Sequence, residues 1–141
     1  MPNKINIPKP KKLSYAIILL IVSVILGVIN YFVITQTSPK WFIYSFYRRF
    51  FSTLFTYSIQ LFLIYQISIS KKWARNTFLI LLILDILVQF SAIASFKFNS
   101  IVGFISVVSS VLQIIAIIMI YSKESNEWFN LRNMQQNNRN L

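Results

Sequence analysis

Apolar residues dominate four long stretches of this chain, at residues 13–35, 50–70, 76–96 and 98–122. Each stretch is uncharged or nearly so, and each is long enough to cross a bilayer as a helix, which takes about 20 apolar residues. All four Pro residues lie outside these stretches, where they do not interrupt a helix. The pattern therefore predicts an all-α integral membrane bundle of four transmembrane helices.

The start of the second helix allows two interpretations. The segment 36–49 is rich in aromatic residues and ends in Arg48 and Arg49. Either it forms a short interfacial helix on the outer surface, or the second helix begins near residue 42 and tilts, with both arginines reaching lipid phosphates. We prefer the second interpretation. The predicted spans are then 13–35, 42–70, 76–96 and 99–122.

Little of the chain lies outside the spans. Residues 1–12 form a basic arm, and the first span is predicted to be retained, because its 23 residues exceed the core of about 7–15 residues in a cleaved signal peptide. Residues 123–141 are rich in Asn and Gln. Such a segment buries too little apolar surface to offset its ordering entropy, so we predict a polar, disordered tail.

Basic residues are divided unevenly between the two sides of the membrane. With four crossings, the arm, the second connection and the tail share one side and carry ten Lys and Arg, whereas the other two connections carry four. Because Lys and Arg collect in short cytoplasmic loops, both termini are predicted to be cytoplasmic. The net charge of +11 lies at helix ends, which suits anionic lipid headgroups and not nucleic acid, which needs a basic domain face.

Five residues are predicted to anchor the helices at the two membrane surfaces. Aromatic rings settle at headgroup depth, and Arg side chains reach the phosphates from there. The predicted anchors are Trp41, Arg48, Arg49, Trp73 and Trp128.

Asp85 is the main candidate for chemistry, since it lies near the middle of the third span. An acid exposed to lipid there costs at least about 2.5–3.5 kcal/mol, so it faces protein or water, or is protonated. A few polar residues share its depth to within about 5 Å, counted from the midpoints of the four apolar stretches, or share its helix face. This predicted intramembrane polar layer comprises Asp85, Gln60, Gln113, Ser23 and Gln89.

Small and polar residues also form a stripe along one face of each span. In lipid, close backbone approach and side-chain hydrogen bonds hold helices together. We therefore expect the stripes to meet around Asp85. The predicted helix-packing residues are Gly27, Asn30, Gly103, Ser106 and Ser110.

Catalysis is not expected from this composition. The chain has no His, no Cys and only three acidic residues, so imidazole bases, thiol nucleophiles and His/Cys metal sites are excluded. Neither a cofactor nor a metal is predicted. Asp85 has two interpretations, either as a structural residue that fixes the register of the bundle or as a proton- or cation-coupled site.

Three short motifs carry a resemblance to a known group of proteins. They are the leader Lys9-Pro10-Lys11-Lys12, the turn Ser70-Lys71-Lys72-Trp73-Ala74-Arg75, and the segment from Tyr121 to Phe129 that ends the fourth helix. Together they resemble small four-span bacterial inner-membrane proteins of uncharacterised function. The resemblance extends over nearly the whole chain and implies the topology and the bacterial inner membrane, but no activity and no site.

Two classes of function remain. The first is a non-enzymatic interaction or accessory protein of the inner membrane, which binds a membrane protein partner through its helix faces. The second is a small proton- or cation-coupled transporter that uses Asp85 and forms a homodimer, since four helices rarely enclose a substrate path. We prefer the first, because small four-span exporters carry their essential acid in the first helix and this chain has none there.

Overall fold

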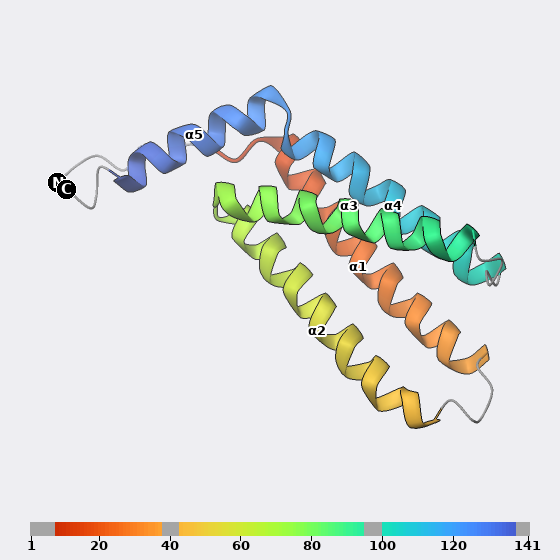
Figure 1. Cartoon of the computed structure of the whole chain (residues 1–141). Coiled ribbons are helices and arrows are strands. Elements are labelled where there is room, and N and C mark those ends of the chain that lie inside the picture. Colours follow the sequence, from red (N-terminus) through yellow and green to blue (C-terminus); the bar gives the residue numbers. More distant parts are fainter. Residues whose placement is uncertain (1–7, 38–42, 95–99, 138–141) are drawn as a thin grey trace.

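The computed structural model describes residues 8–37, 43–94 and 100–137, and this part of the chain is all-α (Figure 1). It contains five helices: α1 (Lys11–Thr37), α2 (Ile43–Ser68), α3 (Lys72–Ala94), α4 (Ser100–Ile120) and α5 (Lys123–Asn137). Side chains are described at residues 8–33, 47, 50–88 and 101–135.

Three helices in the described ranges are long and apolar enough to cross a membrane. Their candidate spans are Lys11–Val33 in α1, Phe50–Ser68 in α2 and Ile101–Ile120 in α4. The described part of α3 is not among them, although the sequence predicts a span at residues 76–96. The chain is thus a helical protein with three candidate membrane-spanning helices, which supports a multi-pass membrane protein.

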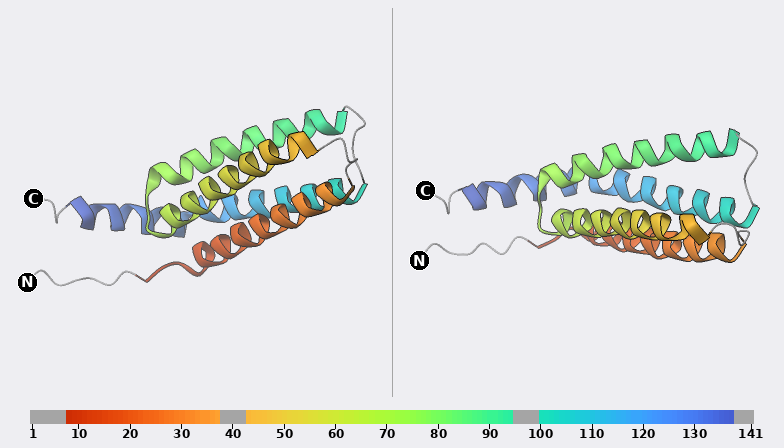
Figure 2. Two further views of the ribbon diagram at one scale, coloured as in Figure 1. Left: turned by 90° about the horizontal axis from the view of Figure 1, so that it is seen from below. Right: turned by 60° about the horizontal axis from the view of Figure 1, so that its bottom comes forward.

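The four long helices run alternately in opposite directions and lie roughly along one axis (Figure 2). Helix α1 packs most extensively on α4, although the two are far apart in the sequence. Helix α2 packs on both α3 and α1, in each case less extensively than α1 packs on α4. Figure 1 shows α2 and α3 separating as they leave their shared turn. The bundle therefore consists of a close α1–α4 pair and a more open α2–α3 hairpin.

The apolar core is concentrated at the end of the bundle where α5 lies; we call it the packed end. Helices α1 and α3 bury residues from their first halves there, and α2 and α4 bury residues from their last turns. The buried apolar residues include Leu13, Ala16, Leu20, Leu63, Ile67, Ala74, Phe78, Ile120, Trp128 and Phe129. Each long helix thus contributes the half that lies near α5.

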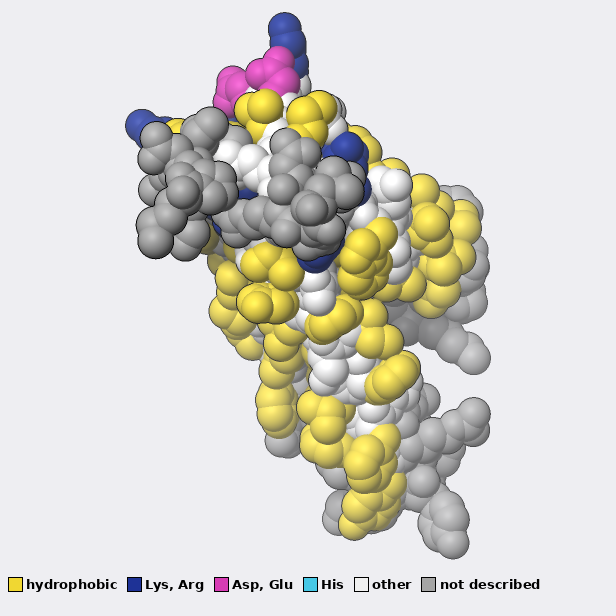
Figure 3. All heavy atoms as spheres, turned by 90° about the vertical axis from the view of Figure 1, so that its left-hand side faces the viewer, with side chains coloured by type: hydrophobic (Ala, Val, Ile, Leu, Met, Phe, Trp, Pro, Cys, Tyr) yellow, Lys and Arg dark blue, Asp and Glu magenta, His cyan; other side chains and the backbone are white. Residues whose placement is uncertain are grey.

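Apolar side chains are mostly exposed along the rest of the bundle, as in a protein surrounded by lipid. Figure 3 shows one face, on which the visible charged side chains gather around α5 and apolar side chains cover the region beyond it. Large exposed apolar residues occur on all four long helices. Examples are Phe32, Phe55, Val88, Phe104 and Ile118.

A tight turn at Ser70 joins α2 to α3. Ser70 has a φ of 69°, in the left-handed region that most residues avoid. The amide of Lys71 donates to the Gln66 carbonyl at 3.0 Å, and the amide of Ser70 donates to the Ile67 carbonyl at 3.0 Å. These two bonds form a Schellman motif, which satisfies the last carbonyls of α2.

The residues after Ser122 form helix α5, so the prediction of a disordered tail is wrong for residues 123–137. Residues 138–141 lie outside the described part. Trp128 and Phe129 are buried against the packed end, with 5% and 0% of their surfaces exposed. The prediction considered only the high Asn and Gln content of this segment. The burial of Trp128 and Phe129 provides apolar contacts that offset the entropy cost of ordering the helix.

Polar side chains of α5 cap the end of α4 and fix the bend between the two helices. Ser125 donates its hydroxyl proton to the Met119 carbonyl at 3.0 Å, and the Asn126 amide donates to the Tyr121 carbonyl at 3.0 Å. Ser122 is the N-cap of α5, and its carbonyl accepts a hydrogen bond from the backbone N–H of Asn126 at 2.9 Å. The bend is therefore built from hydrogen bonds specific to this segment.

Arg75 of α3 connects the hairpin to α5. Its guanidinium lies 4.3 Å from the ring centroid of Tyr121 and 5.2 Å from that of Phe129, and it donates to the side-chain oxygen of Asn126. The Tyr121 hydroxyl donates to Asn76 on α3 at 2.7 Å. We call these five residues the Arg75 clamp. It combines cation–π contacts with side-chain hydrogen bonds at the packed end.

Candidate intramembrane pocket

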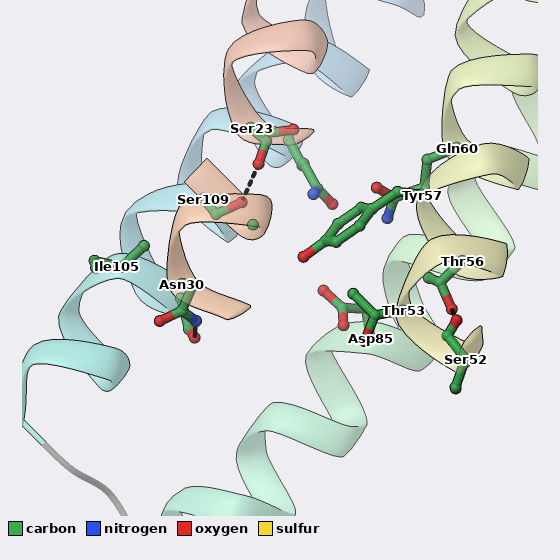
Figure 4. A pocket seen from close by; sticks show the side chains of 13 residues that line it. Ser23, Asn30, Ser52, Thr53, Thr56, Tyr57, Gln60, Asp85, Ile105 and Ser109 are labelled. Atoms are coloured by element: carbon green, nitrogen blue, oxygen red, sulfur yellow. Dashed lines mark hydrogen bonds between the residues drawn. The ribbon is translucent and has the colours of Figure 1, made fainter. Parts of the chain in front are cut away.

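A polar pocket of about 270 Å³ lies among the four long helices (Figure 4). Its lining residues lie on the side of the core away from α5. Its lining is mostly polar, although the surrounding helices are mostly apolar. Helix α1 supplies Ser23, Gly27 and Asn30; α2 supplies Ser52, Thr53, Thr56, Tyr57 and Gln60; α3 supplies Asp85; α4 supplies Ile105, Ser106, Ser109 and Gln113.

The structure brings most of the predicted polar layer into this pocket. Asp85, Gln60, Gln113 and Ser23 all line it. The side chain of Gln89, the fifth member, lies outside the described residues. The sequence predicts that these residues lie at the same depth. The packing of the helices also brings them close together in the plane of the membrane, which depth alone does not show.

The predicted helix-packing residues lie in the pocket wall or beside it. Gly27, Asn30 and Ser106 line the pocket, while Gly103 and Ser110 are buried on α4. Asn30 donates to the Ser106 hydroxyl at 2.9 Å, and Ser109 donates to the Ser23 carbonyl at 3.1 Å. Both bonds join α1 to α4, the closest helix pair in the bundle.

Four of the hydroxyl protons around the pocket are directed to backbone carbonyls. Ser23 donates to Leu20 at 2.7 Å, and Ser106 donates to Val102 at 3.0 Å. Thr56 and Ser109 likewise donate to the carbonyls of Ser52 and Ser23. A hydroxyl has one proton and two lone pairs. These side chains therefore offer the pocket acceptor atoms only.

The orientation of the Asn30 amide follows from the same reasoning. Because Ser106 gives its proton to Val102, it accepts from Asn30, so the Asn30 NH₂ group faces Ser106. The Asn30 Oδ1 atom is then buried without a hydrogen-bond partner among the described residues, and so is Gln60 Oε1. Buried acceptors without a donor are costly and rare.

Tyr57 extends from α2 across the pocket to α1. A Cβ added at Gly27 would lie 2.8 Å from Tyr57 Cε1 and closer still to the Tyr57 hydroxyl, so only glycine leaves room for the ring. Figure 4 shows the Tyr57 hydroxyl and the Asp85 carboxyl group directed into the same space. Tyr57 thus connects the glycine of α1 to the acid of α3.

Sequence reasoning missed Tyr57, because a tyrosine in an aromatic-rich helix is not distinctive. A usable signal was its depth. Gly27 and Tyr57 each lie three residues from the midpoints of the apolar stretches 13–35 and 50–70, residues 24 and 60, on the side away from the packed end. In antiparallel helices they are therefore at about the same depth. A glycine facing a large aromatic residue at one depth is a pair worth testing.

The electrostatic character of the pocket is set by Asp85. Among the described lining residues it is the only charged group, and no Lys or Arg contributes. No group of three His, Cys, Asp or Glu residues lies together in the described ranges. The described lining therefore combines one carboxyl group with neutral hydroxyl and amide groups.

The predicted surface anchors have different environments. Trp73, at the start of α3, is half-exposed and lies beside Phe62, with 6.2 Å between the ring centroids. Trp128 is buried in the packed end, with Arg132 at 5.8 Å from its ring centroid, and so packs against protein. Trp41 and the side chains of Arg48 and Arg49 lie outside the described residues.

No protein-family model, curated protein or solved structure matches this chain. The resemblance to small four-span bacterial proteins therefore stays a prediction.

Proposed function

We propose that α3 is a fourth membrane span, so that the four long helices cross the bilayer together. Lys12 at the start of α1 forms an ion pair with Glu124 at 2.7 Å, just beyond the end of α4. Asn133 of α5 donates to the Ser70 carbonyl at the α2–α3 turn at 3.3 Å. All four helices thus have one end at the packed end. The 23 residues of α3 extend about 34 Å, enough for a hydrocarbon core of about 30 Å.

The packed end is proposed to face the cytoplasm. It holds Lys11, Lys12, Lys72, Arg75 and Lys123, and cytoplasmic loops are enriched in Lys and Arg. Both termini would then be cytoplasmic. Together with the resemblance to bacterial four-span proteins, this favours the bacterial inner membrane, with anionic lipid headgroups as the partners of the basic side chains.

For function, we propose a small membrane transporter that binds a cation in the pocket, with Asp85 as its counter-charge. The observation that carries the proposal is the group of acceptors around Asp85, including the buried Asn30 Oδ1 and Gln60 Oε1 atoms, which have no donor among the described residues. A cation or a cationic hydrogen-bond donor in the pocket would satisfy these two acceptors and lie close to the carboxylate. An accessory protein that binds through its helix faces has no need of such a lining, so the geometry favours transport.

Proton coupling follows from the same residue. A bound cation favours the carboxylate form of Asp85 over its protonated form. Cation and proton therefore compete for Asp85, which is the minimum requirement for exchange. Because four helices rarely enclose a complete path, we expect a homo-oligomer, which a native mass spectrum would detect.

The test is cation binding by the purified protein in mild detergent, with proton release followed at the same time. Asp85→Asn should abolish both signals while retaining helicity and a single elution peak. Glu127→Gln is the matched control, because it removes the same charge from an exposed site on α5 and should bind as the wild type does.

Two results would contradict this function. Cation binding that survives Asp85→Asn would remove the residue from the site. If the wild type binds no cation and instead purifies with a stoichiometric foreign membrane protein, the pocket is structural and the accessory function is the better one.

A further inference from the structure

Helix α2 has little protein contact for its composition. Residues 50–62 include no buried side chain, although five of them are Ser, Thr or Gln. The buried share of the candidate span is 17% in α2, 22% in α1 and 28% in α4, and α2 is also the least apolar of the three. Polar side chains within a membrane face protein more often than lipid. The least apolar span is therefore the one that most needs a further protein surface.

One face of α2 points away from the polar pocket. Its residues recur every three or four positions, which places them on one side of the helix, and the residues of α2 that line the pocket lie on the opposite side. All members of this face are exposed. The same spacing is typical of a helix that packs along a second, nearly parallel helix. We call this face the α2 seam; it comprises Phe51, Leu54, Ser58, Leu61 and Tyr65.

Ser58 is the small residue at the centre of the seam. It lies two residues from residue 60, the midpoint of the apolar stretch 50–70, and thus about 3 Å from mid-depth. Its hydroxyl donates to the Leu54 carbonyl at 2.8 Å. Large apolar side chains lie one turn before and one turn after it. A small residue in such surroundings lets the backbone of another helix approach closely, so Ser58 marks a crossing point.

A second copy of this chain offers a surface of sufficient area. Six large side chains on the seam or beside it are each about half exposed or more, namely Phe51, Leu54, Phe55, Leu61, Phe62 and Tyr65. At about 100 Å² each, they offer about 600 Å² per copy, and two copies reach the lower limit of about 1,200 Å² for a specific interface. A twofold axis brings the same residues of both copies together.

We propose that a second copy docks on the α2 seam, so that the two α2 helices cross at Ser58. This inference rests on the homo-oligomer expected under the proposed function and names its interface. The uneven distribution of basic residues gives both copies the same orientation in the membrane, so the two helices run parallel. Each α2 is then held between its own bundle and its partner.

The test uses single cysteines, because the chain has none of its own. Ser58→Cys, oxidised in native membranes with copper phenanthroline, should form a disulfide-linked dimer on a non-reducing gel, since a disulfide needs Cα atoms within about 7 Å. Each of the other long helices provides a half-exposed control at similar depth. These controls, Ile25→Cys, Ile83→Cys and Val111→Cys, should stay monomeric.

Two further positions determine the orientation of the helices. Phe51 and Tyr65 each lie seven residues from Ser58. In a parallel pair, Phe51→Cys should cross-link to Phe51→Cys, and Tyr65→Cys to Tyr65→Cys. Cross-links only between co-expressed Phe51→Cys and Tyr65→Cys chains would show an antiparallel pair and contradict the proposal.

The size of residue 58 should control the dimer. Ser58→Phe fills the crossing point and should weaken the dimer at least about tenfold, as measured by native mass spectrometry over a range of protein concentrations. Ser58→Ala keeps the side chain small and should leave the dimer unchanged. An unchanged dimer in Ser58→Phe would overturn the inference.

The outcomes separate this interface from the function on which it rests. A Ser58→Cys variant that stays monomeric overturns the inference, whether a control position cross-links instead or lipid covers the seam, and cation binding through Asp85 would be unaffected. Cross-linking at Ser58 in a protein that binds no cation through Asp85 would support the interface and contradict the cation-binding function.

Discussion

The two halves of the bundle differ in how they satisfy their polar groups. In the packed end, Arg75 donates to Asn126 and Tyr121 donates to Asn76, over a core that includes Phe129, and Arg75 Nε is the buried side-chain atom left without a partner among the described residues there. In the pocket half, hydroxyl protons return to backbone carbonyls, and Gln60 Oε1 has no donor among the described residues. The first half uses polar groups for stability, whereas the second leaves acceptors available to a ligand.

The largest effect on stability should come from removing a buried ring from the core of the packed end. Phe129→Ala removes a fully buried ring and should lower the free energy of unfolding by about 3–5 kcal/mol. Phe104→Ala is the control, since Phe104 is 71% exposed on α4 in the other half, and it should lower stability by less than about 1 kcal/mol. Thermal unfolding in detergent, followed by circular dichroism, measures both. Equal losses would show that α5 does not stabilise the bundle.

The Arg75 clamp should come next. Arg75→Ala removes the cation–π contacts and leaves Asn126 Oδ1 without its donor, so we expect a loss of about 2–3 kcal/mol. Lys72→Ala removes an exposed positive charge one turn earlier in α3 and should be nearly neutral. The same unfolding measurement applies. A loss for Lys72→Ala as large as that for Arg75→Ala would mean that net charge, and not the clamp, matters.

Much of this architecture can be predicted from the sequence, because its strongest signals are local. Long apolar runs are typical of helices, and the position of Asp85 within its run places it at mid-depth beside Gln60. Tyr57 is harder to find, because its role depends on a glycine in another helix. Helix α5 was missed because two buried aromatic residues outweigh many polar neighbours, and composition averages over them. The Arg75 clamp depends on the bend between α4 and α5, which the spacing of apolar residues along the sequence does not predict.

A smaller effect, confined to the pocket half, should follow from Gly27→Ala. The new methyl group would overlap the Tyr57 ring, and such overpacking costs about 1–3 kcal/mol unless the ring moves. A displaced Tyr57 should also weaken cation binding. In a Tyr57→Leu background, Gly27→Ala should be nearly neutral for stability, which a double-mutant cycle would show. Full additivity of the two changes would mean that the ring does not rest on the glycine.

Gln60→Met tests whether the buried Gln60 Oε1 atom contributes to cation binding, and it should have opposite effects on binding and stability. The thioether has a similar shape and removes the buried carbonyl oxygen, so cation affinity should fall by about tenfold. Stability should stay the same or rise by up to about 1 kcal/mol, since an unsatisfied buried acceptor is lost. Titration and thermal unfolding of one preparation give both numbers. A variant that loses stability and keeps its affinity would make Gln60 a packing residue.

The smallest change should come from Ser70→Gly at the α2–α3 turn. Ser70 adopts a positive φ of 69°, which costs an L-residue about 1–2 kcal/mol and glycine much less. Part of this gain is lost to the greater freedom of glycine in the unfolded chain, and the hydroxyl bond to the Ile69 carbonyl also disappears. We therefore expect a net stabilisation of about 0.5–1 kcal/mol, with cation affinity unchanged because the turn lies at the packed end. Ser68→Gly, inside the last turn of α2, is the control and should destabilise by about 0.5–1 kcal/mol. If Ser70→Gly altered binding, the two halves would be coupled through α2, and the separation of a stabilising end from a binding half would have to be abandoned.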